Sequence, residues 1–168
     1  ISVVRKLLTV RDVRYSQWFR VVGHKVEPEL RISTLENEYI AEWDTMNAIP
    51  LEECKTWSTQ PGVLAFDIEC YSNNHRAMPD KYNALHVAYM ISCIYQRYKD
   101  PASRRRYGIV IGDCNHIPPE KLANCEIITV DSEYEMIEAF GRIVTETDPD
   151  ILTGYNILGF DYPYLDHR

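Results

Sequence analysis

Long apolar runs are missing from this sequence of 168 residues. The longest apolar-leaning stretch, Ala84–Tyr95, covers 12 residues and includes a histidine, whereas a helix needs about 20 apolar residues to cross a bilayer. The sequence also begins with isoleucine, and no signal-peptide pattern follows. We therefore expect no membrane partner, and we expect the sequence to be a fragment of a longer protein.

Metal-binding cysteine pairs and an excess of basic charge are also absent. The five cysteines form no CxxC pair, and the five histidines show no zinc-ligand spacing. An odd cysteine count without a secretory signal predicts free thiols in a reducing, intracellular compartment. The net charge is −7, divided into −1 for residues 1–62 and −6 for residues 63–168. A domain that binds nucleic acid by charge alone should be basic, so nucleic-acid chemistry here requires acids that bind a metal or a basic groove elsewhere.

A segment with proline and glycine, residues 58–62, is the expected boundary between two parts. We expect residues 1–62 to form a mixed α+β region with a helix near Lys6–Arg14 and strands at Gln17–Val22 and Glu38–Trp43. The tryptophans of this region fit packing roles better than base-stacking roles. Nothing in it indicates catalytic chemistry.

The pattern of residues 63–168 predicts a mixed α/β fold, with strands followed by α/β alternation. Ser132 and Glu135 form a capping-box pattern before an apolar stripe of helical period, so a helix is expected from there until Pro149. A second helix is expected to follow the last strand, within 156–166. A turn is predicted over Lys99–Arg106, and its basic end could contact phosphate or simply be solvated. The expected strands are Val63–Cys70, Leu85–Tyr98, Tyr107–Gly112, Glu126–Val130 and Asp150–Tyr155.

Two carboxylates interrupt the apolar strand Val63–Cys70. Because side chains alternate along a strand, Asp67 and Glu69 share one face, about 6.6 Å apart. Carboxylates in a central strand are costly unless they are paired or bind a metal. Taken alone, the pattern also fits an edge strand with a solvated acidic end.

A second candidate lies at Tyr155-Asn156-Ile157-Leu158-Gly159-Phe160-Asp161, where a strand ends and a helix begins. Asp161 stands near the helix start, so its simplest role is an N-cap. Phe160 could pack in the core or against a single-stranded end. Asn156 could stabilise a turn, orient the loop or touch a substrate.

Together, the two segments resemble the first two exonuclease motifs of family B DNA polymerases. Phe66-Asp67-Ile68-Glu69-Cys70 is similar to the first motif, and the N-x-x-x-F-D pattern of Asn156–Asp161 is similar to the second. The residues of both motifs are most similar to those of delta-type eukaryotic enzymes and of polymerases of large DNA viruses. The resemblance implies a ribonuclease-H-like exonuclease fold, a mixed β-sheet with flanking helices, over residues 63–168. It also implies that residues 1–62 are part of the polymerase N-terminal region.

By the same resemblance, Asp67, Glu69 and Asp161 would be catalytic ligands of two Mg²⁺ ions, with Mn²⁺ as a substitute. Asn156 and Phe160 would contact the single-stranded 3′ end of a DNA primer. Carboxylate oxygens are the ligands that such hard cations prefer, and two ions can stabilise both the attacking and the leaving oxygen of phosphodiester hydrolysis.

The function implied is that of a fragment of a DNA-directed DNA polymerase used in replication, covering part of its 3′→5′ proofreading exonuclease. The third exonuclease motif and the palm aspartates are not in the sequence, so the fragment alone is expected to be inactive. Deoxynucleotides, accessory replication proteins and a location in the nucleus or at a viral replication site are expected for the parent protein. Two alternatives remain: a free-standing ribonuclease-H-like exonuclease, and a non-catalytic single-strand-binding module.

Overall fold

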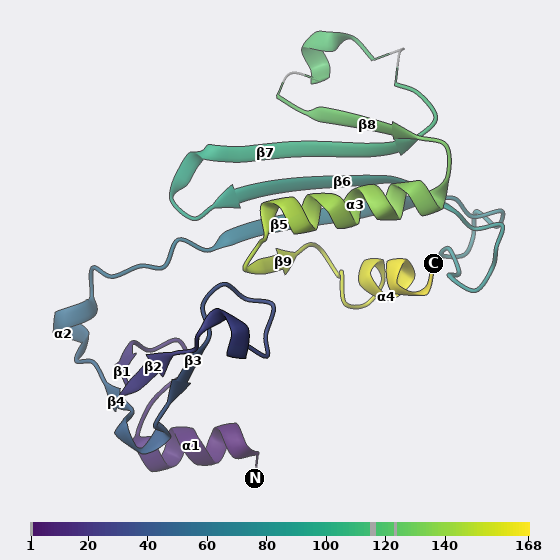
Figure 1. The fold of residues 1–168 in the computed structure, drawn as a ribbon. Helices are drawn as coiled ribbons and strands as arrows, with labels where there is room; N and C mark the ends of the chain where they lie inside the picture. The colour runs from purple at the N-terminus through teal and green to yellow at the C-terminus, as the bar shows by residue number, and fades with distance from the viewer. Residues whose placement is uncertain (1, 115–116, 123) are drawn as a thin grey trace. The chain divides into compact units, whose positions relative to one another are not determined.

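The computed structural model describes residues 2–114, 117–122 and 124–168, and only the main chain of residue 119. These residues divide into two compact units, Ile1–Ser58 and Thr59–Arg168 (Figure 1). Each unit has its own buried side chains, and each is described here by itself. The helices of the described residues include none that is long and apolar enough to cross a membrane.

The first unit combines short helices with small antiparallel strand pairs. Helix α1 starts after Ser2, whose side chain accepts a hydrogen bond from the Arg5 amide, as an N-cap residue does. The Trp18 and Trp57 rings meet edge to face at 5.5 Å, but these two residues and Trp43 are exposed, so none of the three is a core residue of this unit. Its elements are α1 (Val3–Arg11), β1 (Phe19–Arg20) paired with β4 (Asn47–Ala48), β2 (Gly23–Lys25) paired with β3 (Tyr39–Ala41), η1 (Pro28–Leu30), η2 (Trp43–Thr45) and α2 (Leu51–Cys54).

A five-stranded mixed sheet forms the centre of the second unit, counted over the described residues. Its strand order is β8-β7-β6-β5-β9, in which β5, β6 and β7 form an antiparallel meander while β8 and β9 run parallel to their neighbours. Figure 1 shows the long helix α3 lying across one face of this sheet. The elements are β5 (Gly62–Cys70), β6 (Ala88–Arg97), β7 (Asp100–Ile111), η3 (Pro119–Leu122), β8 (Glu126–Val130), α3 (Glu133–Thr147), β9 (Ile151–Thr153) and α4 (Asp161–His167).

The expected turn over Lys99–Arg106 is wrong. Strand β7 already begins at Asp100, and the hairpin loop is only Tyr98 and Lys99. Lys99, the second residue of this loop, takes the left-handed conformation, with φ 61°. Asp100 and Pro101 gave the turn signal, but after a shift of register the ladder to β6 resumes at Arg105 and Arg106, opposite Tyr95 and Ile94.

The expected strand Leu85–Tyr98 begins three residues later than predicted, at Ala88. The preceding residues, 71–87, form a loop that holds itself together with local hydrogen bonds. The His86 amide donates to the Asn83 carbonyl at 2.9 Å, which closes a turn just before the strand. The apolar residues just before Ala88 therefore led to a predicted strand that extends into a turn.

Helix α3 forms as its sequence pattern predicts. The Ser132 hydroxyl accepts a hydrogen bond from the Glu135 amide at 3.2 Å. The Glu135 carboxylate reaches back one residue further than a standard capping box, to the Asp131 amide at 2.8 Å. The helix ends at Thr147 because Asp148 turns left-handed, with φ 40°. Its buried face packs on β6, β7 and β8.

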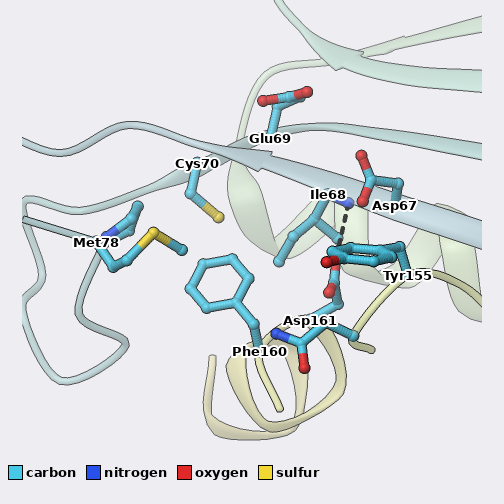
Figure 2. A pocket seen from close by; sticks show the side chains of 10 residues that line it. Asp67, Ile68, Glu69, Cys70, Met78, Tyr155, Phe160 and Asp161 are labelled. Atoms are coloured by element: carbon cyan, nitrogen blue, oxygen red, sulfur yellow. Dashed lines mark hydrogen bonds between the residues drawn. The ribbon is translucent and has the colours of Figure 1, made fainter. Parts of the chain in front are cut away.

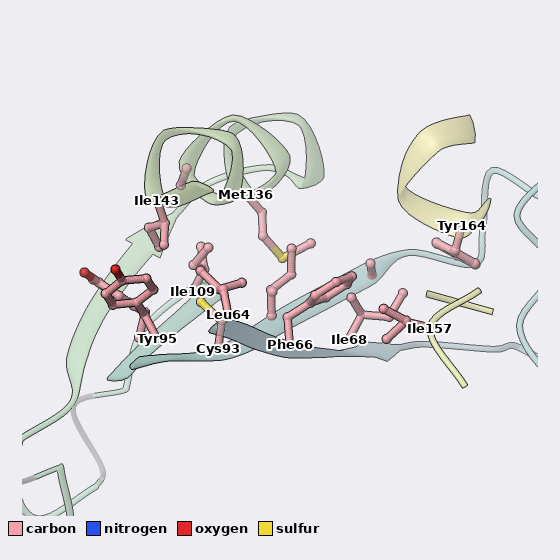
Figure 3. Close-up of a cluster of buried hydrophobic side chains, with 14 residues drawn as sticks. Leu64, Phe66, Ile68, Cys93, Tyr95, Ile109, Met136, Ile143, Ile157 and Tyr164 are labelled. Carbon is pink, nitrogen blue, oxygen red and sulfur yellow. The ribbon is translucent and has the colours of Figure 1, made fainter. Parts of the chain in front are cut away.

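The hydrophobic core lies between the sheet and α3 (Figure 3). Along β5, alternate side chains Leu64, Phe66 and Ile68 are buried in this core, whereas Asp67 and Glu69 are exposed. Helix α4 adds Tyr164, which is 1% exposed. Each large side chain removed from water in this way stabilises the fold by about 1.5–3 kcal/mol. The core thereby fixes which face of β5 carries the carboxylates.

Candidate active site

The two carboxylates of β5 lie on the sheet face opposite to the core. Asp67 and Glu69 stand one residue apart on either side of Ile68, whose side chain is buried. Strand β5 lies between β6 and β9 in the sheet, so it is not an edge strand along its whole length. The sequence prediction that both carboxylates share one face is confirmed, and they are open to solvent.

Strand β9 accompanies β5 only along its first half. The parallel pairing covers Val63, Leu64 and Ala65, opposite residues 151–153. The chain then passes close to β5 at Gly154, where an added Cβ would collide with the Phe66 carbonyl oxygen. Beyond this point β5 leaves an amide available on its β9 side, namely that of Ile68.

Asp161 binds this amide. Its Oδ1 accepts a hydrogen bond from the Ile68 N–H at 3.1 Å, and the residue is 3% exposed (Figure 2). Asp161 is the first residue of α4, and the N-cap position belongs to Phe160, for which the described residues provide no side-chain cap. The side chain of Asp161 is thus committed to β5, so the simple N-cap reading is wrong. The bond places this carboxylate beside the segment that carries Asp67 and Glu69.

A cleft of about 310 Å³ joins these residues. All five side chains singled out from the sequence line it, and so do five residues that the motifs did not identify as site residues. Figure 2 shows the carboxylates of Asp67 and Glu69 projecting from β5 and that of Asp161 from the start of α4. The lining consists of Asp67, Ile68, Glu69, Cys70, Met78, Pro79, Tyr155, Asn156, Phe160 and Asp161.

Asn156 and Phe160 each combine a structural role with a place in the cleft. Asn156 has φ 55°, a conformation that asparagine tolerates better than most residues, and its carbonyl accepts from the amides of Gly159 and Phe160. Phe160 packs against the core through Tyr164, with ring centres 5.5 Å apart. The turn-stabilising role of Asn156 is therefore present, and substrate contact by either residue stays a prediction.

Burial raises the pKa of two groups at the cleft, the Cys70 thiol in its lining and the Tyr164 hydroxyl next to it. Desolvation raises the pKa of the Cys70 thiol to about 12, and the negative charges of Glu133, Asp161 and Glu69 act in the same direction. Burial likewise raises the pKa of Tyr164 to about 12. The Tyr164 hydroxyl donates to the His86 carbonyl oxygen at 2.6 Å. Both groups stay neutral near pH 7, so the charge of the cleft comes from its carboxylates.

The donor set of the cleft suits a hard divalent cation. Three carboxylates line it, and oxygen ligands of this kind are those that Mg²⁺ and Mn²⁺ prefer. Across residues 2–114, 117–122 and 124–168, no three potential ligand side chains are gathered closely enough to form a complete metal site. The structure therefore brings the three acids to one cleft without closing them into one ligand cluster.

Comparison with known proteins decides the family. The family described as "DNA polymerase family B, exonuclease domain" matches residues 1–168. This chain belongs to the family B DNA polymerase exonuclease domains. The DNA polymerase catalytic subunit of Epstein-Barr virus is 31% identical over 169 aligned positions, covering 100% of this chain and 16% of the relative.

Other relatives of this exonuclease domain come from viruses, a protozoan and an archaeon. A DNA polymerase of invertebrate iridescent virus 3 is 27% identical over 90% of the chain and 14% of its own length. The DNA polymerase delta catalytic subunit of Plasmodium falciparum is 27% identical over 82% of the chain and 12% of its own length. The family B polymerase of Pyrobaculum calidifontis has the same fold, with a TM-score of 0.67 at 22% identity over 100% of this chain and 17% of that one. The chain spans only a small part of these proteins.

The family and the mixed α/β fold predicted from the two motifs are confirmed. The motifs of this exonuclease domain did not reveal Met78, Pro79 or Cys70 as cleft residues. Met78 and Pro79 belong to the loop 71–87, whose path depends on side-chain contacts that no local pattern encodes. The Ile68 amide was missed for a simpler reason, because every residue except proline has one.

Proposed function

We propose that this chain forms part of the 3′→5′ proofreading exonuclease of a replicative family B DNA polymerase, with Asp67, Glu69 and Asp161 as its metal-binding catalytic acids. One observation carries the proposal: the buried Asp161 carboxylate accepts the Ile68 amide, next to both acids of β5 and in the same cleft. Burying a carboxylate is costly, and among the described residues its hydrogen-bond partner is the Ile68 amide. That bond holds the carboxylate in the cleft with Asp67 and Glu69, where the three acids together would bind cations.

Exonuclease domains of this family are metal-dependent, and the oxygen-only donor set fits Mg²⁺, with Mn²⁺ as the substitute. Asp67 and Glu69 would hold one ion, and Asp67 with Asp161 a second. When bound, such ions activate water and stabilise the leaving 3′-oxygen. The role of the protein is to hold the three acids at one end of β5, with Asp161 fixed by the strand itself.

The substrate proposed is the single-stranded 3′ end of DNA. Tyr155 is 93% exposed, and Phe160 lines the same cleft, so both rings are available to bases. Aromatic stacking tolerates every base and is worth about 1–3 kcal/mol per base, which suits an enzyme that removes any mispaired nucleotide. Asn156 would hold the loop between the two rings.

The remainder of the proposal concerns the parent protein. We propose that the parent protein adds deoxynucleotides to DNA and that accessory replication proteins bind it. We also propose that it acts where viral or cellular DNA is replicated. Residues 1–62 are proposed to belong to its N-terminal region. The third exonuclease motif and the palm would be supplied by other parts of that protein.

The test is the Asp67→Ala variant and the Asp67/Glu69 double alanine variant in the full-length protein. We expect both to abolish Mg²⁺-dependent degradation of a labelled single-stranded 3′ end and to leave extension of a primed template intact. The exposed carboxylate Glu146, on α3, provides the matched control Glu146→Ala, which should retain both activities. Unchanged degradation in the double variant would show that these acids are structural. Binding of the single strand without any degradation by the wild type would favour a non-catalytic module instead.

A further inference from the structure

The loop of residues 71–87, which joins β5 to β6, forms one wall of the cleft. Met78 and Pro79 come from this loop and face the carboxylate end of β5. In Figure 2, Met78 lies across from Phe160, on the far side of the cleft from Asp67. Since the loop has no strand or helix of its own in the described residues, its shape depends on side chains that hold it.

His86 is the second-last residue of this loop, and groups from the rest of the loop surround its ring. It is 5% exposed, although histidine is a polar residue at the end of a surface connection. The Asp80 amide donates to its Nδ1 at 2.8 Å, and the Oδ1 of Asn73 lies 2.8 Å from its Nε2. The side chains of Asn83 and Ser72 approach the same nitrogen at 3.2 and 3.5 Å. The ring therefore links both ends and the middle of the loop.

These contacts show which nitrogen of the His86 ring carries the proton. Because Nδ1 accepts a hydrogen bond from a backbone amide, the proton of the neutral imidazole is on Nε2. Nε2 then donates to the Asn73 Oδ1, and the Asn83 Nδ2, itself a donor, only lies close to it. Asp80 directly follows Pro79, so the bond to Nδ1 fixes the backbone adjacent to the cleft wall.

The same residue touches the helix that carries Asp161. The His86 carbonyl oxygen accepts the Tyr164 hydroxyl at 2.6 Å. The loop and α4 are also joined by the Lys81 ammonium, which donates to the Pro163 carbonyl at 3.2 Å. The loop is thus joined to residues 161–168 by several contacts, and His86 contributes one of them through its backbone carbonyl while its ring holds the loop together.

We propose that His86 is a positioning residue of the exonuclease site: its imidazole holds the Met78–Pro79 wall in place against the helix of Asp161, so that the single-stranded 3′ end is held at the carboxylates. This inference rests on the proposed function. His86 does not line the cleft and acts through the loop. Because the wall would contact the bound strand and not the bond that breaks, its displacement should weaken binding of the strand more than it slows the chemical step.

The variants that test this separate the two nitrogens. His86→Asn keeps an oxygen near the position of Nδ1 and so an acceptor for the Asp80 amide, whereas His86→Phe keeps the bulk and removes both bonds. Asn73→Ala removes the Nε2 partner from an exposed position, so it remains informative if His86→Phe does not fold. The control is His75→Phe, which changes an exposed histidine of the same loop.

In the full-length protein, we expect His86→Phe to raise KM for a single-stranded 3′ end about tenfold, equivalent to about 1.4 kcal/mol of binding free energy, with a much smaller change in kcat. His86→Asn should recover most of that loss, and Asn73→Ala should change KM in the same direction by less. Extension of a primed template and the His75→Phe variant should be unaffected. A fall in kcat with unchanged KM, or no difference between the two His86 variants, would overturn the positioning role.

Amide hydrogen exchange provides a measurement that does not depend on activity. Exchange in residues 71–87 should accelerate in His86→Phe and return toward wild type in His86→Asn. Equal exchange in all variants would refute the role of His86 in the loop. If the wild-type protein degrades no DNA, or Asp67→Ala degrades as well as wild type, the proposed function fails, and the exchange data still decide whether His86 holds the loop.

Discussion

Replacing Asp161 by asparagine and by alanine separates the two roles of this side chain. The structure gives it a mechanical role, as acceptor for the Ile68 amide in a buried position, and we assign it a chemical role as a metal ligand. Asparagine keeps an oxygen acceptor of the same length but has no charge. Alanine removes both the acceptor and the charge.

The expected changes in stability follow from the hydrogen bond. Asp161→Ala leaves the Ile68 N–H buried without a partner, which costs about 1–3 kcal/mol. Asp161→Asn replaces a charge-assisted bond with a neutral one and should cost at most about 1 kcal/mol. Asp67→Ala, at an exposed position, should change the free energy of unfolding by no more than about 0.5 kcal/mol. Urea unfolding of the three variants beside wild type measures this order.

The loss of activity should not follow the loss of stability, because it should be similar in the three variants. All three substitutions remove a proposed metal ligand, so each should slow degradation of a labelled single-stranded 3′ end by about 10³-fold, equivalent to about 4 kcal/mol of barrier. The result that would refute the reasoning is an Asp161→Asn variant with wild-type degradation. Asp161 would then be a structural acceptor for β5, and its charge would have no part in the chemistry.

Two further predictions concern the surroundings of the site. Gly154→Ala should lower the free energy of unfolding in urea by about 1–3 kcal/mol, because the new methyl group collides with the Phe66 carbonyl oxygen. The control, Gly141→Ala, lies at an open position within α3 and should raise the free energy of unfolding by up to about 1 kcal/mol. A loss of stability in both variants would contradict this prediction. Cys70 should react far more slowly with iodoacetamide at pH 8 in the folded protein than in urea, because its pKa is raised to about 12 and the thiol stays protonated. Since the folded-state pKa lies above the ordinary value of 9.0, the stability that the neutral thiol provides is lost as the pH rises from about 9 toward 12. Mass spectrometry of the labelled peptide measures the rates, and equal rates in both states would be evidence against burial.

The parts of the fold that follow local rules could be predicted from the sequence. The faces of β5 follow from strict alternation, and α3 follows from its N-cap and its apolar period. The turn at Lys99–Arg106 was wrong because a proline beside an aspartate is a turn signal wherever it occurs, and here it stands at the start of a long strand. Local signals do not show how far a ladder continues.

The candidate site could be predicted only as a set of residues. Two motifs identified Asp67, Glu69 and Asp161, and the structure brings them to one cleft. The bond that places Asp161 runs to a backbone amide 93 residues away in the chain, and a backbone amide has no signature in a sequence. The role of His86 was missed for a related reason, since its partners become neighbours only after the loop has closed.

The incomplete pairing of β5 also affects how this sheet could associate with other chains. A strand with a free row of amides and carbonyls is a template for another chain, and proteins protect such edges with charge or by covering them. Where β9 stops, the Asp161 carboxylate occupies the next open donor of β5. One acidic side chain therefore blocks the addition of a strand from another molecule at this point of β5, and it does so without covering the cleft.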